Sequence, residues 1–207
     1  MEKNISQATL ERMPLYYRTL CAAEEKGVVV ISSQELGKIL NITPEKIRKD
    51  LTLFGQFGKK GIGYYVGDLK NKIENILGLQ YHWRLGIVGA GHLGSALANY
   101  KNFPSMGFQI VALFDTDERI IGAEINGVKI YDFQKINSVA TRKLIDIGVI
   151  TVPDTQAQDV ANKLVEAGVL GIWNFAPIKL EVPPQITLVN EDLSIGLTSL
   201  SYHLTQK

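Results

Sequence analysis

Three glycines at a fixed spacing carry the clearest chemical signal in this chain. Gly89, Gly91 and Gly94 form a G-x-G-x-x-G turn directly after the apolar segment 85–88. The first glycine permits a tight turn out of a strand, the second lets the backbone approach a pyrophosphate, and the third allows a helix to pack closely on the strand. Free amides at the start of that helix can bind the diphosphate. The spacing therefore predicts a dinucleotide-binding site.

A second apolar run, 108–114, ends in Asp115. This acid lies about twenty residues after the turn, where the fold needs an acceptor for ribose hydroxyls. A glycine motif alone would also fit a structural turn, but strand, helix, second strand and acid in this order favour a dinucleotide site. The carboxylate would repel a 2′-phosphate, so we expect NADH and NAD+ rather than the phosphorylated cofactor. The expected contacts here are Gly89, Ala90, Gly91, His92, Leu93, Gly94 and Asp115.

Further segments continue the alternation of strands and helices. Strands are predicted at 127–131, 145–152, 171–175 and 185–189, with an amphipathic helix at 154–167. This order is typical of a doubly wound parallel sheet of the Rossmann type, in which the nicotinamide half lies at the carboxyl ends of later strands. Pro153 and Pro177, which follow two of these strands, could equally serve only to end them. The candidate residues are Thr151, Val152, Pro153, Asn174, Phe175, Ala176 and Pro177.

The first eighty residues have a different pattern, that of short helices. Pro14 is predicted to start a helix that ends at Gly27, and a short strand follows at 28–31. Ser32, with Glu35 three residues later, forms a capping box for the next helix.

A tight turn links that helix to a third one. Asn41 can end the second helix in a left-handed conformation, and Thr43 caps the third with Pro44 at its first position. Two short helices joined by a three-residue turn predict a helix-turn-helix.

The third helix has two distinct faces at about 100° per residue. Ile47, Leu51 and Phe54 lie on one side, and the polar residues lie on the other. A solvated face would explain this for most helices, but segment 57–66 follows as a glycine-tipped hairpin with two lysines at its apex. The combination predicts a winged helix, with the helix in the major groove and the wing reaching the minor groove. DNA contacts are expected from Arg12, Arg18, Thr43, Lys46, Arg48, Lys49, Thr52, Lys59, Lys60 and Gly61.

Composition supports this division. The 207 residues carry a net charge of only +1, yet residues 41–72 hold seven basic and three acidic side chains. This local excess of positive charge favours binding to a polyanion. A helix at 68–79, closed by Gly78, links the two parts, so we place the boundary near residue 80.

Several classes of protein are not expected. No apolar run approaches the roughly 20 residues of a membrane helix, and the polar start is unlike a secretory signal, so the expected location is cytoplasmic. One cysteine excludes an internal disulfide, and three histidines without ligand spacing indicate no metal site. A dehydrogenase would need a substrate domain after residue 150 and a proton-transfer group, and neither is evident, so no catalytic residue is assigned. Coenzyme A is the rival ligand, which Asp115 disfavours.

The whole chain resembles the redox-sensing transcriptional repressor Rex family. The similarity is carried by 48–51, 54–64, the turn 89–94, 174–177 and 190–192. The chain departs from that family at Lys60, where many relatives have Arg, and at Leu193, where some have an aromatic residue.

The resemblance implies a homodimeric repressor that binds palindromic operator DNA and releases it when NADH binds. It implies a winged-helix domain at 1–80, an NAD(H)-binding domain at 81–190 and a C-terminal helix at 191–207 that is exchanged between subunits. By the same resemblance, Tyr100 and Asp192 lie near the nicotinamide, and Arg18 couples the two domains.

Overall fold

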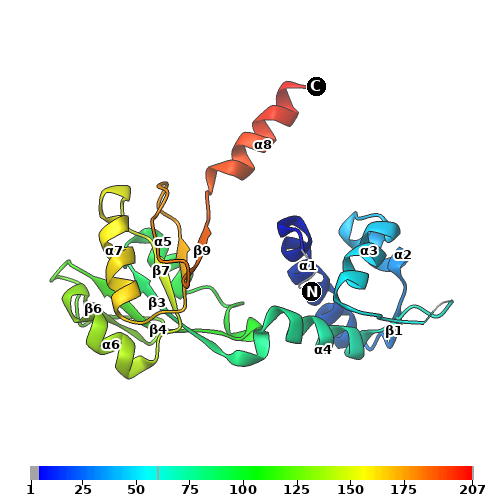
Figure 1. Ribbon diagram of the computed structural model, residues 1–207, viewed down its shortest axis with the longest axis horizontal. Helices are drawn as coiled ribbons and strands as arrows, with labels where there is room; N and C mark the ends of the chain where they lie inside the picture. The colour runs from blue at the N-terminus through cyan, green and yellow to red at the C-terminus, as the bar shows by residue number, and fades with distance from the viewer. Residues whose placement is uncertain (1–4, 60, 207) are drawn as a thin grey trace. The chain divides into compact units, whose positions relative to one another are not determined.

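The structure is a computed structural model that describes residues 5–59 and 61–206. The chain divides into two compact units, one ending at Tyr81 and the other beginning at His82. The N-terminal unit is helical with a small two-stranded sheet, and the C-terminal unit is built on a seven-stranded sheet (Figure 1). This confirms the predicted α/β class, with a winged helix-turn-helix followed by a Rossmann sheet.

The helices of the N-terminal unit begin and end largely at the predicted local signals. Its elements are α1 (Gln7–Glu25), β1 (Val30–Ile31), α2 (Ser33–Leu40), α3 (Pro44–Phe54), β2 (Tyr64–Tyr65) and α4 (Val66–Leu77). Ser32 and Glu35 form the predicted capping box, and Asn41 is left-handed with φ 55°. The Thr43 hydroxyl accepts from the backbone of Lys46 at the start of α3.

The predicted start of the first helix was wrong. Helix α1 begins at Gln7, capped by Ser6, and Pro14 lies inside it. Proline removes one backbone donor from a helix interior, and the carbonyl of Leu10 loses that partner. Met13, Tyr16 and Leu20 are fully buried. Their packing outweighs the lost hydrogen bond. An argument from local helix propensity does not include this packing.

The hairpin of the wing is also shorter than predicted. Among the residues of the wing that the structure describes, Lys59 pairs with Gly63, and Tyr64–Tyr65 instead pairs antiparallel with Val30–Ile31. Val66 already belongs to α4, which ends at Leu77 rather than at residue 79. The second arm leaves the wing early because Tyr64 and Val66 are buried in the core of the unit.

The C-terminal unit has the predicted doubly wound arrangement. Its strand order is β5-β6-β4-β3-β7-β8-β9, and all neighbours are parallel except β5 and β6. The strands are β3 (Trp83–Val88), β4 (Phe108–Asp115), β5 (Glu124–Ile125), β6 (Val128–Asp132), β7 (Ile147–Ile150), β8 (Gly171–Asn174) and β9 (Thr187–Asn190). The helices are α5 (His92–Ala98), α6 (Ile136–Lys143), α7 (Asp154–Glu166) and α8 (Ser194–Thr205).

The edge strand β5 and the helix α6 of this unit were not predicted, nor were the short 3-10 helices at Pro104–Met106 and Phe133–Lys135. Strand β5 has only two residues and pairs with β6 through the turn at Asn126 and Gly127, both at positive φ. One core cluster lies between the sheet and helices α6 and α7, and a second lies on the opposite face beside α5. Within residues 5–59 and 61–206, no helix is long and apolar enough to cross a membrane.

Candidate functional site

The glycine turn leaves one opening in its backbone. A Cβ on Gly89 would lie 2.7 Å from the carbonyl oxygen of Thr151, and one on Gly94 would collide with the carbonyl oxygen of Gly89. A Cβ on Gly91 would meet nothing within 4 Å. Two of the glycines are therefore required by packing, and the third presents open backbone. This geometry fits a pyrophosphate approaching at Gly91.

Asp115 lies directly against this turn at the end of β4. Its Oδ2 accepts the backbone N–H of Ala90 at 2.8 Å, and its Oδ1 accepts those of Thr116 and Asp117 at 2.7 and 3.0 Å. Each carboxylate oxygen has two lone pairs, so Oδ2 keeps capacity for a further donor. The structure thus brings together the glycine turn and the acid predicted to bind ribose hydroxyls.

Thr151 braces the turn from the neighbouring strand. Its hydroxyl donates to the carbonyl oxygens of Val88 and Gly89 at 3.0 and 2.8 Å. Val152 is half-buried beside it, and Pro153 is exposed at the cap of α7. The side chain of Thr151 is therefore committed to holding the loop. Its backbone N–H donates to the carbonyl oxygen of Val88, and the carbonyl oxygen of Pro153 accepts from Gln156.

The loop after β8 is held from within by Asn174, which is fully buried. Its side-chain amide bonds to the backbone of Ala176 and Ile178 and to the side chain of Asn190. Asn174 therefore positions the segment predicted to contact the nicotinamide. Ala176 is also buried, whereas Pro177 is exposed.

Tyr100 and Asp192 are both exposed. The Tyr100 ring packs edge-on against Phe103 at 4.8 Å, and its hydroxyl accepts from Asn102. The side chain of Asp192 accepts the backbone N–H of Ser194 at 2.8 Å. Hydrogen bonding by the side chain and then by the backbone of Ser194 lowers the pKa of its carboxyl. Their placement at the nicotinamide stays a prediction.

Helix α3 presents the predicted polar face to solvent. Ile47 and Leu51 are buried, while the predicted DNA contacts on this helix are all exposed, namely Lys46, Arg48, Lys49 and Thr52. The guanidinium of Arg48 donates to Ser33 Oγ at 2.8 Å and to Glu45 Oε1 at 2.7 Å. Arg48 is thereby oriented on the exposed face of the helix.

A groove of about 580 Å³ is lined by the wing, including Lys59 and Gly61, by the start of α2, and by Arg48 of α3. Gly61 has φ +85°, and a Cβ added to it would meet nothing within 4 Å, as expected for the open tip of a turn. Lys59 is exposed, and Lys60 lies outside the described residues. A cationic groove beside an exposed helix is suited to a DNA backbone.

Arg12 does not present its charge to solvent as a DNA contact would. Its Nε and one terminal nitrogen donate to Asp50 at 2.6 and 2.8 Å, and its side chain is 18% exposed. The hydroxyl of Tyr16 donates to the same carboxylate at 2.8 Å. Arg12 thus fastens α1 to α3. The other predicted arginine of this helix, Arg18, is exposed.

Sequence reasoning missed Asp50, Ser33 and Glu45. A signal for Asp50 was present, because it lies three residues after Ile47 and so falls on the apolar face of α3. An acid in that position needs a buried partner. The contact of Glu45 with Arg48 also had a signal, because the two residues lie three apart on α3 and so are neighbours on its surface. The contact of Ser33 with Arg48 had none, because it depends on the packing of α2 beside α3.

Comparisons with known proteins agree with a DNA-binding N-terminal part and a nucleotide-binding C-terminal part. Residues 4–52 match a family described as "Putative DNA-binding protein N-terminus", and residues 80–178 match one described as "CoA binding domain". The redox-sensing transcriptional repressor Rex of Desulfitobacterium hafniense is 42% identical over 97% of this chain and 95% of its own length. That of Clostridium perfringens strain 13 is 45% identical over 98% and 96%. The chain belongs to the Rex family.

Solved structures resemble this Rex-family chain over nearly its whole length. The crystal structure of RSP in complex with β-NAD+ and operator DNA matches with a TM-score of 0.91 and 40% identity, over 98% of this chain and 93% of that one. RSP in complex with β-NADH matches with a TM-score of 0.88 and 39% identity, over 98% and 95%. The curated relatives are named transcriptional repressors, as the sequence led us to expect.

Proposed function

We propose that this protein is a transcriptional repressor that binds palindromic operator DNA and releases it when NADH binds. The observation that carries the proposal is that one chain holds both an exposed basic helix beside a wing and a glycine turn closed by Asp115. Because a repressor must reach the chromosome, we place the protein in the cytoplasm.

The proposal assigns a role to each part of the chain. Residues 1–80 would read DNA, 81–190 would bind the cofactor, and 191–207 would join subunits. The glycine turn and Asp115 would hold the adenosine half of NADH, and segments 151–153 and 174–177 would face its nicotinamide. Bound NADH supplies a reduced, uncharged ring where NAD+ has a cationic one, and this is the difference that the protein senses.

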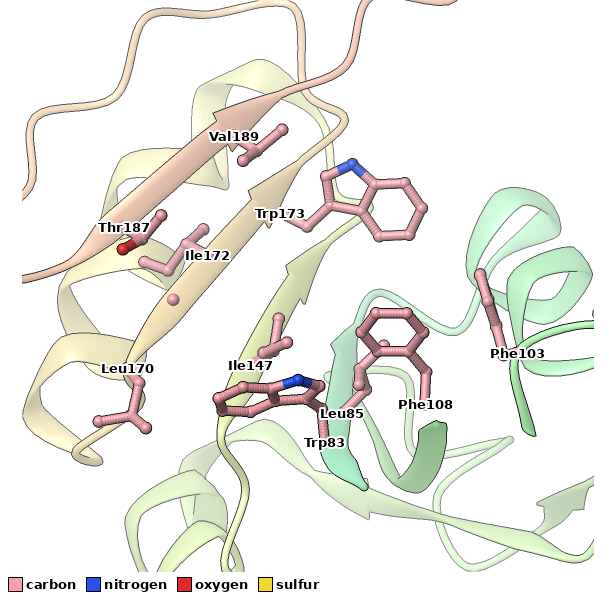
Figure 2. Close-up of a pocket in the computed structure, with 11 residues that line it drawn as sticks. Trp83, Leu85, Phe103, Phe108, Ile147, Leu170, Ile172, Trp173, Thr187 and Val189 are labelled. Atoms are coloured by element: carbon pink, nitrogen blue, oxygen red, sulfur yellow. The ribbon is translucent and has the colours of Figure 1, made fainter. Parts of the chain in front are cut away.

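We infer that two copies assemble through the C-terminal helix. Helix α8 has no buried residue, and its large apolar side chains are 53–71% exposed: Ile195, Leu197, Leu200, Tyr202 and Leu204. The sheet face opposite α6 and α7 carries an apolar pocket of about 430 Å³, into which Trp83, Ile147 and Trp173 project from three strands (Figure 2). Two open apolar surfaces on one chain favour association, and exchange of α8 in a homodimer would cover apolar surface on both subunits.

The experiment that tests the function titrates a palindromic operator into the protein with NADH, with NAD+ and with neither. Coenzyme A serves as a fourth arm, because one matching family is described as CoA-binding. Equal operator affinities with NADH and without ligand would contradict redox sensing, and release by coenzyme A alone would favour the rival ligand.

Arg48→Ala should weaken binding to a specific operator by about 1–3 kcal/mol and relax base choice at one position of each half-site. The reason is that Arg48 is the oriented guanidinium on the exposed face of α3 and can pair with a guanine edge. Lys59→Ala should instead weaken binding to all DNA sequences alike. It should also reduce the salt dependence of DNA binding by the equivalent of about one phosphate contact. Binding titrations on operator and scrambled DNA at several salt concentrations measure both effects.

Glu45→Gln is the matched control for Arg48, because it removes the intrahelical ion pair and keeps the guanidinium. It should retain sequence selectivity. An Arg48→Ala variant that binds operator as tightly and selectively as the wild type would rule out base readout by this residue.

Asp115→Ala combined with Thr116→Arg should raise affinity for the phosphorylated cofactor relative to NADH. The carboxylate beside the glycine turn repels a 2′-phosphate, and a neighbouring guanidinium would attract it. Asp115→Ala alone should also weaken NADH binding, because the N–H of Ala90 loses its acceptor. Calorimetric titration with both cofactors measures the preference.

Glu118→Gln removes an exposed charge three residues away and should leave the cofactor preference unchanged. If the Asp115 variants keep the wild-type preference for NADH, then Asp115 is a structural acid of the strand end and does not select the cofactor.

A further inference from the structure

Asn174 joins the loop after β8, which is predicted to contact the nicotinamide, to the end of β9, two residues before Asp192. It is the last residue of β8 and is 0% exposed. Its side-chain nitrogen donates to Asn190 Oδ1 at 2.9 Å and lies 3.0 and 3.2 Å from the carbonyl oxygens of Ala176 and Ile178. One buried amide therefore contacts both the loop after β8 and the end of β9.

The orientation of this amide is fixed by its surroundings. Asn174 Oδ1 accepts the backbone N–H of Ala176 at 3.0 Å, and a backbone N–H can only donate. The oxygen must therefore face Ala176, and the nitrogen must face its three acceptors. A side-chain amide nitrogen carries two protons, so three acceptors compete for them. One arrangement includes Asn190, and another uses only the two carbonyls of the loop.

The end of β9 leads almost directly into α8. Asn190 is its last residue, and Glu191 donates its backbone N–H to the carbonyl oxygen of Asn174 at 2.8 Å. Only residues 191–193 separate this point from α8, and Asp192 accepts the backbone N–H of Ser194, the first residue of that helix. The hydrogen bond from Asn174 to Asn190 therefore lies four residues before the first residue of the helix.

We propose that the Asn174–Asn190 hydrogen bond couples the loop after β8 to the C-terminal helix and so transmits the state of the cofactor site to the dimer. The inference rests on the proposed function. Both asparagines are positioning residues: the buried side chain of Asn174 is hydrogen-bonded within the protein, and Asn190 acts through it. A shift of loop 175–178 changes how many acceptors Asn174 can satisfy, which makes or breaks the bond to Asn190.

Asn190→Ala tests this, because it removes the competing acceptor from an exposed side chain and leaves the backbone pairing in place. The variant should bind NADH alone and operator alone much as the wild type does. The factor by which NADH lowers operator affinity should change by about 2- to 30-fold, the range typical of residues that modulate coupling. A merely structural role would alter thermal stability or both affinities and leave this factor unchanged.

Two further variants make the test specific. Asn190→Asp keeps an acceptor oxygen for Asn174 and should retain most of the coupling, and Glu191→Ala changes the next side chain and should retain all of it. Wild-type coupling in a folded Asn190→Ala variant would overturn the inference, as would loss of NADH binding itself. An absence of any NADH effect in the wild type would instead contradict the proposed function.

Discussion

Saturating NADH is expected to lower the affinity of this protein for its operator by about 5- to 150-fold. The range corresponds to a coupling free energy of about 1–3 kcal/mol between two sites that share one equilibrium. In the proposed mechanism, NADH favours a dimer in which the two copies of α3 no longer match operator half-sites about one helical turn apart or a multiple of it. Fluorescence anisotropy of a labelled operator at fixed salt measures the effect.

Reciprocity gives this prediction an internal check. If NADH weakens operator binding by a given factor, then operator DNA must weaken NADH binding by the same factor. Two independent titrations should therefore agree. A mismatch between the two factors would show that a second process, such as subunit dissociation, contributes to the release.

NAD+ is the matched ligand control, because it differs from NADH by one hydride and one charge. It should lower operator affinity much less than NADH does. Asp192→Ala should blunt this discrimination while leaving the adenosine half bound at the glycine turn and Asp115. If NADH, NAD+ and no ligand give the same operator affinity, the cofactor is a structural component and the switch does not exist.

Asp50→Ala should lower the free energy of unfolding of the N-terminal unit by about 3–5 kcal/mol, as removal of one partner from a buried ion pair does. Asp50 is 1% exposed and accepts hydrogen bonds from Arg12 and Tyr16. Its loss leaves a guanidinium and a hydroxyl without their acceptor between α1 and α3. Chemical denaturation followed by circular dichroism measures the change.

The loss of stability caused by Asp50→Ala should depend on pH, and the direction follows from the pKa of Asp50. Burial by itself raises the pKa of Asp50, but the hydrogen bonds from Arg12 and Tyr16 outweigh it and hold the pKa below its usual value. A carboxyl with a lowered pKa stabilises the fold above its unfolded pKa of about 4, and this contribution is lost as the pH falls through the folded value. The difference between wild type and Asp50→Ala should therefore narrow below about pH 4.

Glu25→Ala is the control for Asp50, since it removes an exposed acid from α1 and should change stability by less than about 0.5 kcal/mol. An Asp50→Ala variant as stable as this control at neutral pH would show that the buried ion pair contributes little.

Most of the local features that the sequence predicted correctly have partners only a few residues away. The capping box of Ser32 and Glu35, the left-handed Asn41 and the cap at Thr43 each depend on one turn of backbone. The glycine turn and its acid belong to a motif whose spacing encodes its geometry. The two faces of α3 follow from helical periodicity alone, and the structure has Ile47 and Leu51 buried as expected.

Tertiary structure decided the features whose partners are distant along the chain. Packing of buried side chains extends α1 through Pro14, and pairing with Val30–Ile31 draws Tyr64–Tyr65 out of the wing. The ion pair between Arg12 and Asp50 joins residues 38 positions apart and turns an expected DNA contact inward. The hydrogen bond from Asn174 to Asn190 likewise requires β8 and β9 to be neighbours. No local pattern specifies these contacts, because their energies arise only when the sheet and helices have come together.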